Sequence, residues 1–187
     1  MALNRPRRRS QATVRAQAEA ASSGATPEEV RAIGGRKRQN RHIESEHGRA
    51  LIKWRDRAVA TRPLVKWLHH IPNGVVFGSE KKAGMMKAEG LTAGVLDYFL
   101  PVRKPIVRQY VKFTGEYMGS GLYIELKAPG LENHARGGMS EKQEEFATFV
   151  HGQGYAVVLC YHWDQARQAI EAYLDGKPIP HLWSPPT

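Results

Sequence analysis

The segment "GLYIELKAPG", residues 121–130, has the composition of a buried β-strand, yet it carries two charges. Apolar residues such as Ile124 and Leu126 favour a sheet interior, whereas Glu125 and Lys127 interrupt that run. Alternate residues of a strand point to the same face, so the two charges share one face, with their Cα atoms about 6.6 Å apart. Any fold of this chain must therefore bury a sheet and also accommodate two ionised groups on it.

The rest of the chain alternates helical and strand-like patterns. Residues 44–60 have the spacing of an amphipathic helix, and Ser140 with Gln143 has the spacing of a capping box that begins another. The order of these patterns predicts an α/β fold with a mixed central β-sheet flanked by helices. The other predicted elements are an apolar strand at 95–100, a basic loop or hairpin at 103–120, a buried strand at 155–161 and a helix at 163–174.

Charge and composition divide the 187 residues into three parts. Residues 1–41 form a basic tail, which we expect to be largely disordered apart from a short helix that begins near Thr26 and ends at Gly34 and Gly35. Residues 42–176 form one domain and residues 177–187 a Pro-rich tail. No apolar run reaches the ~20 residues of a membrane span, so no membrane association is expected.

Compartment is indicated by cysteine usage. The single Cys160 lies in the apolar segment "YAVVLCY" and has no intrachain partner for a disulfide. A buried thiol of this kind acts as a small apolar side chain rather than as a nucleophile. We therefore predict a reducing cytoplasm, that of a bacterium or of a phage-infected host cell.

A second charge, Asp97, interrupts the apolar strand at 95–100. Neighbouring strands lie about 4.8 Å apart, so Asp97 and Glu125 can converge on one divalent cation, Mg²⁺ or Mn²⁺. Lys127 then reaches the attacking water or the anionic group under attack, which is chemistry suited to hydrolysing a phosphodiester. The alternative is that Glu125 and Lys127 form a partly buried ion pair while Asp97 caps a loop. We predict that the two charges form two sides of one substrate pocket rather than a salt bridge.

Several ordered motifs resemble a known family. "GVLDYFLP", "GLYIELKAPG" and "SEKQEEFATFVHGQGYAVVLCY" are similar to the virus-type replication-repair nuclease (VRR-NUC) domain of the PD-(D/E)xK nuclease superfamily. The similarity extends from about His42 to Leu174 and includes "HIPNG" and "KAEGLTAG". It implies a restriction-endonuclease-like core and DNA cleavage that depends on Mg²⁺ or Mn²⁺.

The resemblance also implies roles for individual residues. Asp97 and Glu125 match the metal ligands and Lys127 the catalytic lysine, with the carbonyl of Leu126 as a further ligand. Glu46 matches an acidic residue on the first helix of the family, with Glu44 as the alternative, and Gln143 matches a glutamine beside the active site. Two departures are Leu96, where the family usually has proline, and the long excursion at 103–120.

Residues for DNA contact are less sharply marked. His70, Asn73, Lys81, Lys82 and Lys87 are candidates for binding backbone phosphates, although a turn and a solvated helical face would also account for them. Four aromatic residues in apolar settings are expected in the core rather than as stacking platforms: Trp54, Trp67, Phe146 and Phe149.

Together these features predict a metal-dependent deoxyribonuclease acting on branched DNA, of the Holliday-junction or flap type, in replication, repair or recombination. By analogy with phage-type junction enzymes, a homodimer would present two active sites to opposing strands. Two alternatives are a DNA-binding or recruitment module with a silent centre and a restriction-like endonuclease with a defined recognition sequence.

Overall fold

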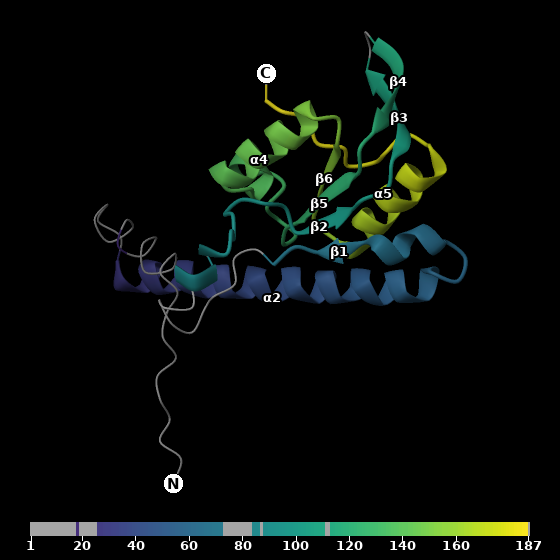
Figure 1. The fold of residues 1–187 in the computed structure, drawn as a ribbon. Coiled ribbons are helices and arrows are strands. Elements are labelled where there is room, and N and C mark those ends of the chain that lie inside the picture. Colours follow the sequence, from purple (N-terminus) through teal and green to yellow (C-terminus); the bar gives the residue numbers. More distant parts are fainter. Residues whose placement is uncertain (1–17, 19–25, 73–83, 87, 111–112, 187) are drawn as a thin grey trace. The chain divides into compact units, whose positions relative to one another are not determined.

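The computed structural model describes residues 18, 26–72, 84–86, 88–110 and 113–186 (Figure 1). The chain divides into two compact units, Met1–Ile43 and Glu44–Thr187. Helix α2 (Pro27–Ala58) contributes residues to both units, and the second unit contains the sheet and the candidate site.

The long helix α2 differs from the sequence prediction. We expected a short helix to end at Gly34 and Gly35, but α2 continues through both, so that prediction is wrong. Glycine costs roughly 0.5–1 kcal/mol relative to alanine inside a helix without forbidding helical backbone. The predicted helix at 44–60 is confirmed as the C-terminal part of α2.

A four-stranded mixed sheet, in the order β1-β2-β5-β6, forms the centre of the second unit. Strands β1 (His69–His70), β2 (Tyr98–Leu100) and β5 (Leu122–Leu126) pair antiparallel, whereas β5 and β6 (Ala156–Cys160) pair parallel. A parallel pair requires a crossover, and α4 (Glu141–Gly152) provides it between β5 and β6. The predicted mixed sheet is thereby confirmed.

The excursion between the two core strands is a hairpin. Strands β3 (Lys104–Tyr110) and β4 (Phe113–Gly119) pair antiparallel and form a separate two-stranded sheet. Of the two forms predicted for residues 103–120, the hairpin is therefore the one observed.

The two faces of the sheet bury different clusters. On one face, α5 (Trp163–Asp175) packs with the end of α2 and η1 (Pro63–Trp67) over the larger core, which includes the buried side chains of Leu51, Ile124 and Tyr173. On the other face, Ala147 and Val150 of α4 pack over a smaller cluster. In Figure 1 the strands β5 and β6 accordingly lie between α4 and α5.

A close approach between α2 and β2 depends on a glycine. A Cβ atom at Gly48 would collide with the phenol of Tyr98, so this side chain can pack against the helix only because residue 48 has none. The contact fixes the position of the helix segment that begins at Glu44 against the sheet.

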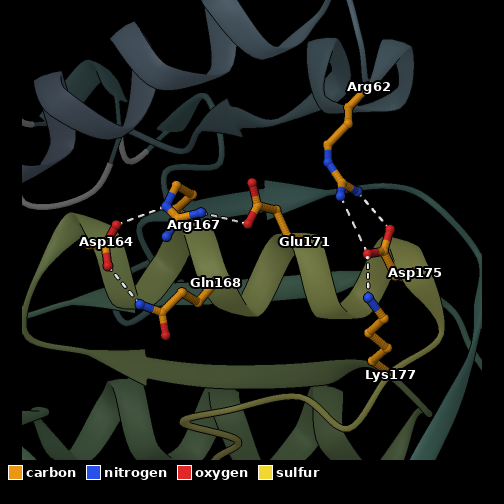
Figure 2. A network of polar contacts seen from close by, with 7 residues as sticks. All are labelled: Arg62, Asp164, Arg167, Gln168, Glu171, Asp175 and Lys177. Atoms are coloured by element: carbon orange, nitrogen blue, oxygen red, sulfur yellow. Dashed lines mark hydrogen bonds and ion pairs between the residues drawn. The ribbon is translucent and has the colours of Figure 1, made fainter.

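The outer surface of α5 carries a network of ion pairs (Figure 2). Arg167 contacts Asp164 at 2.8 Å and Glu171 at 2.6 Å, and Arg62 contacts Asp175 at 2.7 Å. Lys177 Nζ also donates to Asp175, at 3.2 Å. Because these groups are exposed or half-buried, water competes for every contact, and each pair contributes little to stability.

The C-terminal segment covers the edge of the sheet at β6. Leu182 forms an antiparallel bridge with Val158, and the Trp183 amide donates to the Val157 carbonyl at 2.8 Å. Unpaired strand edges invite pairing with other chains, so this segment protects β6 from that contact.

Two aromatic residues that we expected in the core are on the surface. Trp67 is 54% exposed and Phe149 is 63% exposed, so the prediction is wrong for both. Trp67 ends the short helix η1, whose buried residue is Val65, and Phe149 lies beside the buried Val150 on α4 but points away from the core. Within the described ranges, no helix has both the length and the apolar character to cross a membrane.

Candidate active site

Two carboxylates meet where β2 and β5 lie side by side. Tyr98 pairs with Ile124, and continuing this register by one residue sets Asp97 opposite Glu125. The Leu126 amide donates to Asp97 Oδ2 at 3.0 Å, which fixes the aspartate against β5. The two acidic residues that interrupt the apolar strands are thus neighbours.

Glu125 is fully buried, with an exposed fraction of 0%. Its Oε1 atom accepts hydrogen bonds from Lys127 Nζ, at 2.6 Å, and from Gln143 Nε2. Its Oε2 atom is buried and has no hydrogen-bond partner within the described part of the chain. Burial, followed by the nearby charge of Asp97, raises the pKa of Glu125 to about 8 although Lys127 opposes the shift.

The contact between Lys127 and Glu125 corrects one prediction. We expected the two charges not to pair, but they form an ion pair in which the lysine side chain is 12% exposed. The lysine stem is long enough to reach back along the strand face, and an unpaired buried charge is costly. Burial lowers the pKa of Lys127, but Glu125, Asp97 and Glu44 together outweigh it and the net shift is upward.

Gln143 connects the start of α4 to this ion pair. It completes the predicted capping box: Ser140 Oγ accepts from the Gln143 amide at 3.3 Å, and Gln143 Oε1 accepts from the Ser140 amide at 2.9 Å. The same Oε1 accepts from Lys127 Nζ at 3.1 Å, while Nε2 donates to Glu125. One side chain therefore caps a helix and orients both charged residues.

The acidic residue that α2 brings to the site is Glu44, which we had ranked second to Glu46. Glu44 Oε1 accepts from the Ala128 amide at 3.2 Å, directly after Lys127. Glu46 is exposed and lies about 200° further round the helix. The spacing of residues in the sequence does favour Glu44. Glu44, Gly48 and Leu51 are spaced four and three apart, which places them on one face of the helix, and Gly48 and Leu51 are buried.

The edge strand β1 lies beside Asp97. The Ile71 amide donates to the Asp97 carbonyl at 2.8 Å, and the exposed His70 lies edge-on to Tyr98 with ring centroids 5.2 Å apart. Burial raises the pKa of Asp97, against the opposing effects of the Leu126 amide, Lys127 and His70. Of the other predicted DNA contacts, Asn73, Lys81, Lys82 and Lys87 lie outside the described residues.

The donor set fits a hard divalent cation. Among the described residues no three His, Cys, Asp or Glu side chains converge as a metal cluster, and the two carboxylates that lie opposite each other across β2 and β5 are those of Asp97 and Glu125. Mg²⁺ is commonly bound through one or two carboxylates, with waters and substrate oxygens completing its shell. Oε2 of Glu125 has no hydrogen-bond partner within the described part of the chain, and burial raises the pKa of both carboxylates, so a bound cation would stabilise their ionised forms. The carbonyl of Leu126 belongs to the same strand segment and can add a third oxygen.

Comparison with solved structures shows a similarity of fold. A solved structure described as a VRR_NUC domain protein matches with a TM-score of 0.51 and 24% sequence identity, covering 73% of this chain and 91% of that chain. At this identity the likeness concerns the fold, and it confirms a restriction-endonuclease-like α/β core. No protein-family model and no curated protein sequence matches the chain.

Proposed function

We propose that this chain is a divalent-metal-dependent DNA endonuclease that hydrolyses phosphodiester bonds in branched DNA. The observation that carries the proposal is the buried carboxylate of Glu125, which has an orphaned oxygen and lies beside Asp97. Buried ionisable groups are expensive, and strongly shifted pKa values cluster at functional sites. The fold likeness to a VRR_NUC domain protein supports a nuclease over other chemistries that need two carboxylates and a lysine.

In this proposal Asp97, Glu125 and the Leu126 carbonyl hold the ion. When bound, Mg²⁺ or Mn²⁺ supplies Lewis-acid polarisation of the phosphoryl oxygens and makes a water molecule more acidic. Asp97 is held in place for this task by the Leu126 amide, and Glu125 is oriented by Gln143.

Lys127 acts as a cation rather than as a base. Its pKa lies above the usual value although burial lowers it, so the ammonium group keeps its protons at neutral pH. A group that stays protonated cannot abstract a proton, but it can donate to the phosphoryl oxygens on which negative charge develops. Gln143 Oε1, at 3.1 Å, keeps the ammonium directed at the site.

Two features support DNA as the substrate. The net charge is +10 at pH 7, and the excess lies mainly in residues 1–41, where Lys and Arg outnumber Glu. Basic segments of this kind bind nucleic-acid backbone with an affinity that falls as salt rises. A preference for branched DNA and the action of a two-fold dimer on opposing strands are part of the proposal, by analogy with junction enzymes.

The test is cleavage of a four-way junction, a flap and a linear duplex of matched sequence, with Mg²⁺, with Mn²⁺ and with a chelator. Wild type should cut the branched substrates only when metal is present. Glu125→Gln keeps the side-chain volume and removes the charge, so it should lower the rate at least about 100-fold. Wild-type rates from a folded Glu125→Gln variant would refute the site. Discrete fragments from the linear duplex would instead indicate a sequence-specific enzyme.

A further inference from the structure

An exposed surface at the β1 edge of the sheet is formed by η1 and β1. We call it the edge surface, and it consists of Leu64, Lys66, Trp67, His69 and His70. Trp67 is 54% exposed and Leu64 is 42% exposed, and the two histidines are exposed as well. Large apolar side chains at the surface of a domain mark a binding site when they cluster.

The backbone that displays Trp67 is anchored on both sides. Val65 and Leu68 are fully buried, and the Leu68 carbonyl accepts a hydrogen bond from Arg55 Nη1 at 2.9 Å. His69 Nδ1 also lies 2.9 Å from the Trp67 carbonyl oxygen. The indole is therefore held outward by a fixed backbone, and its exposure is a property of the fold.

The edge surface also has the charge expected for an anionic partner. The sequence contains no Asp or Glu between Asp56 and Glu80. Lys66 Nζ lies 4.8 Å from the centroid of the Trp67 ring, so an ammonium group and an aromatic face are presented together. This combination, a cation beside a stacking surface, is how proteins bind single-stranded nucleic acid.

The chain links the edge surface to the candidate active site. From Trp67 the chain runs through β1 to Ile71, whose amide donates to the carbonyl of Asp97. Trp67 ends η1 and Ile71 follows β1, so they are four residues apart and at most about 13 Å of chain separates them, the rise of roughly four stacked bases. A strand cut at Asp97 and Glu125 would thus pass Trp67 a few nucleotides away.

We infer that the edge surface binds the unpaired strand of the DNA substrate, with Trp67 stacked on a base and Lys66 beside the phosphates. The inference rests on the proposed nuclease function and specifies how a branched substrate is distinguished. A base inside a duplex has both faces covered by its neighbours, so an indole can stack only on a base that is unpaired or at an end. The edge surface therefore selects DNA that has a single-stranded arm next to the cleavage point.

The experiment measures binding of the full-length protein, in a chelator to prevent cleavage, to a flap duplex and to a fully paired duplex. Trp67→Ala should weaken flap binding about 5- to 100-fold and leave duplex binding nearly unchanged. Trp67→Phe keeps an aromatic ring and should restore most of the affinity. Phe149→Ala is the matched control, because it removes an exposed aromatic side chain from α4, and it should bind both DNAs as wild type does.

Several outcomes would overturn the inference. Equal flap affinity for wild type and Trp67→Ala, or an equal loss on both DNAs, would show that Trp67 does not read an unpaired base. A change of oligomeric state in Trp67→Ala without a change in DNA binding would assign the edge surface to a second copy of the chain. Cleavage in Mg²⁺ separates the role of Trp67 from the proposed nuclease function. If wild type and Trp67→Ala cut flaps equally, only the role of Trp67 is refuted. If wild type cuts no DNA, the proposed nuclease function is refuted as well.

Discussion

Two groups of charged side chains in the second unit differ in how far water reaches them. On α5, the carboxylates of Asp164, Glu171 and Asp175 are matched by Arg167, Arg62 and Lys177 at the surface (Figure 2). At the candidate active site, Asp97 and Glu44 lie near the ion pair of Lys127 and Glu125, and Glu125 is fully buried. Surface ion pairs contribute little because water competes for each charge, whereas a charge as buried as that of Glu125 is costly unless it is compensated.

The largest expected effect comes from removing Lys127, which forms the ion pair with the buried Glu125. Lys127→Met leaves Glu125 buried without its ion-pair partner, so we expect a loss of about 3–5 kcal/mol in the free energy of unfolding, together with loss of cleavage. Chemical denaturation measures this change. The double variant Lys127→Met/Glu125→Gln removes both charges and should recover most of the stability; a double variant as unstable as Lys127→Met would show that packing, not charge, was lost.

A second prediction separates the two glutamates of α2. Glu44→Gln should lower the cleavage rate about 10-fold, because Glu44 contacts the backbone next to Lys127 and acts on its charge. Glu46→Gln is the matched control on the exposed side of the same helix and should cleave at the wild-type rate. The opposite result, with Glu46→Gln the slower variant, would restore the original assignment from the sequence.

A third prediction concerns the cap that orients the buried group. Ser140→Ala removes the side-chain acceptor at the start of α4 and should cost about 0.5–2 kcal/mol in the free energy of unfolding. Because Gln143 is part of the same capping box, cleavage should also slow. A loss of stability with a fully wild-type cleavage rate would mean that Gln143 keeps its position without the cap.

The smallest effect is expected at the surface network, where it depends on pH. Hydrogen bonds from Arg62 and then Lys177 lower the pKa of Asp175 to about 2, from its ordinary value of 3.8. The stabilisation is therefore present above pH 3.8 and is lost as pH falls from there through about 2. Asp175→Asn should be slightly less stable than wild type near neutral pH, and thermal denaturation should show the difference shrinking in acid. A difference that stays constant across this range would contradict the pairing.

Much of the fold follows from the sequence because apolar patterns report burial directly. The strands around Ile124 and Val158 and the capping box of α4 could be predicted from residue type and spacing alone. The continuation of α2 through Gly34 could not be predicted in this way, because glycine raises the cost of a helix without ending it. The exposure of Trp67 and Phe149 could not be predicted either, because an aromatic residue among apolar neighbours has the same pattern whether it is covered or exposed.

The site was predicted in composition more fully than in geometry. The sequence itself marks four residues of the site, three as charges that interrupt or follow apolar strands and one as part of a capping box. The structure brings all four together: Asp97, Glu125, Lys127 and Gln143. The choice of Glu44 depends on which face of α2 meets the sheet, and that is decided by the collision that Gly48 avoids. The ion pair depends on a rotamer of Lys127, which strand periodicity does not determine.

Gln143 has a consequence for how freely this sequence can change. In a capping box, glutamate serves at this position as well as glutamine, so helix α4 alone would accept either. At the candidate site they are not equivalent, because the Gln143 amide donates to Glu125 while its oxygen accepts from Lys127. A glutamate could not donate unless protonated, and it would add another negative charge beside Glu125. Of the two residues, only glutamine satisfies both the capping box and the candidate site. A substitution at this position chosen for helix stability alone would therefore disturb the hydrogen bonds of Glu125 and Lys127 while the protein stayed folded.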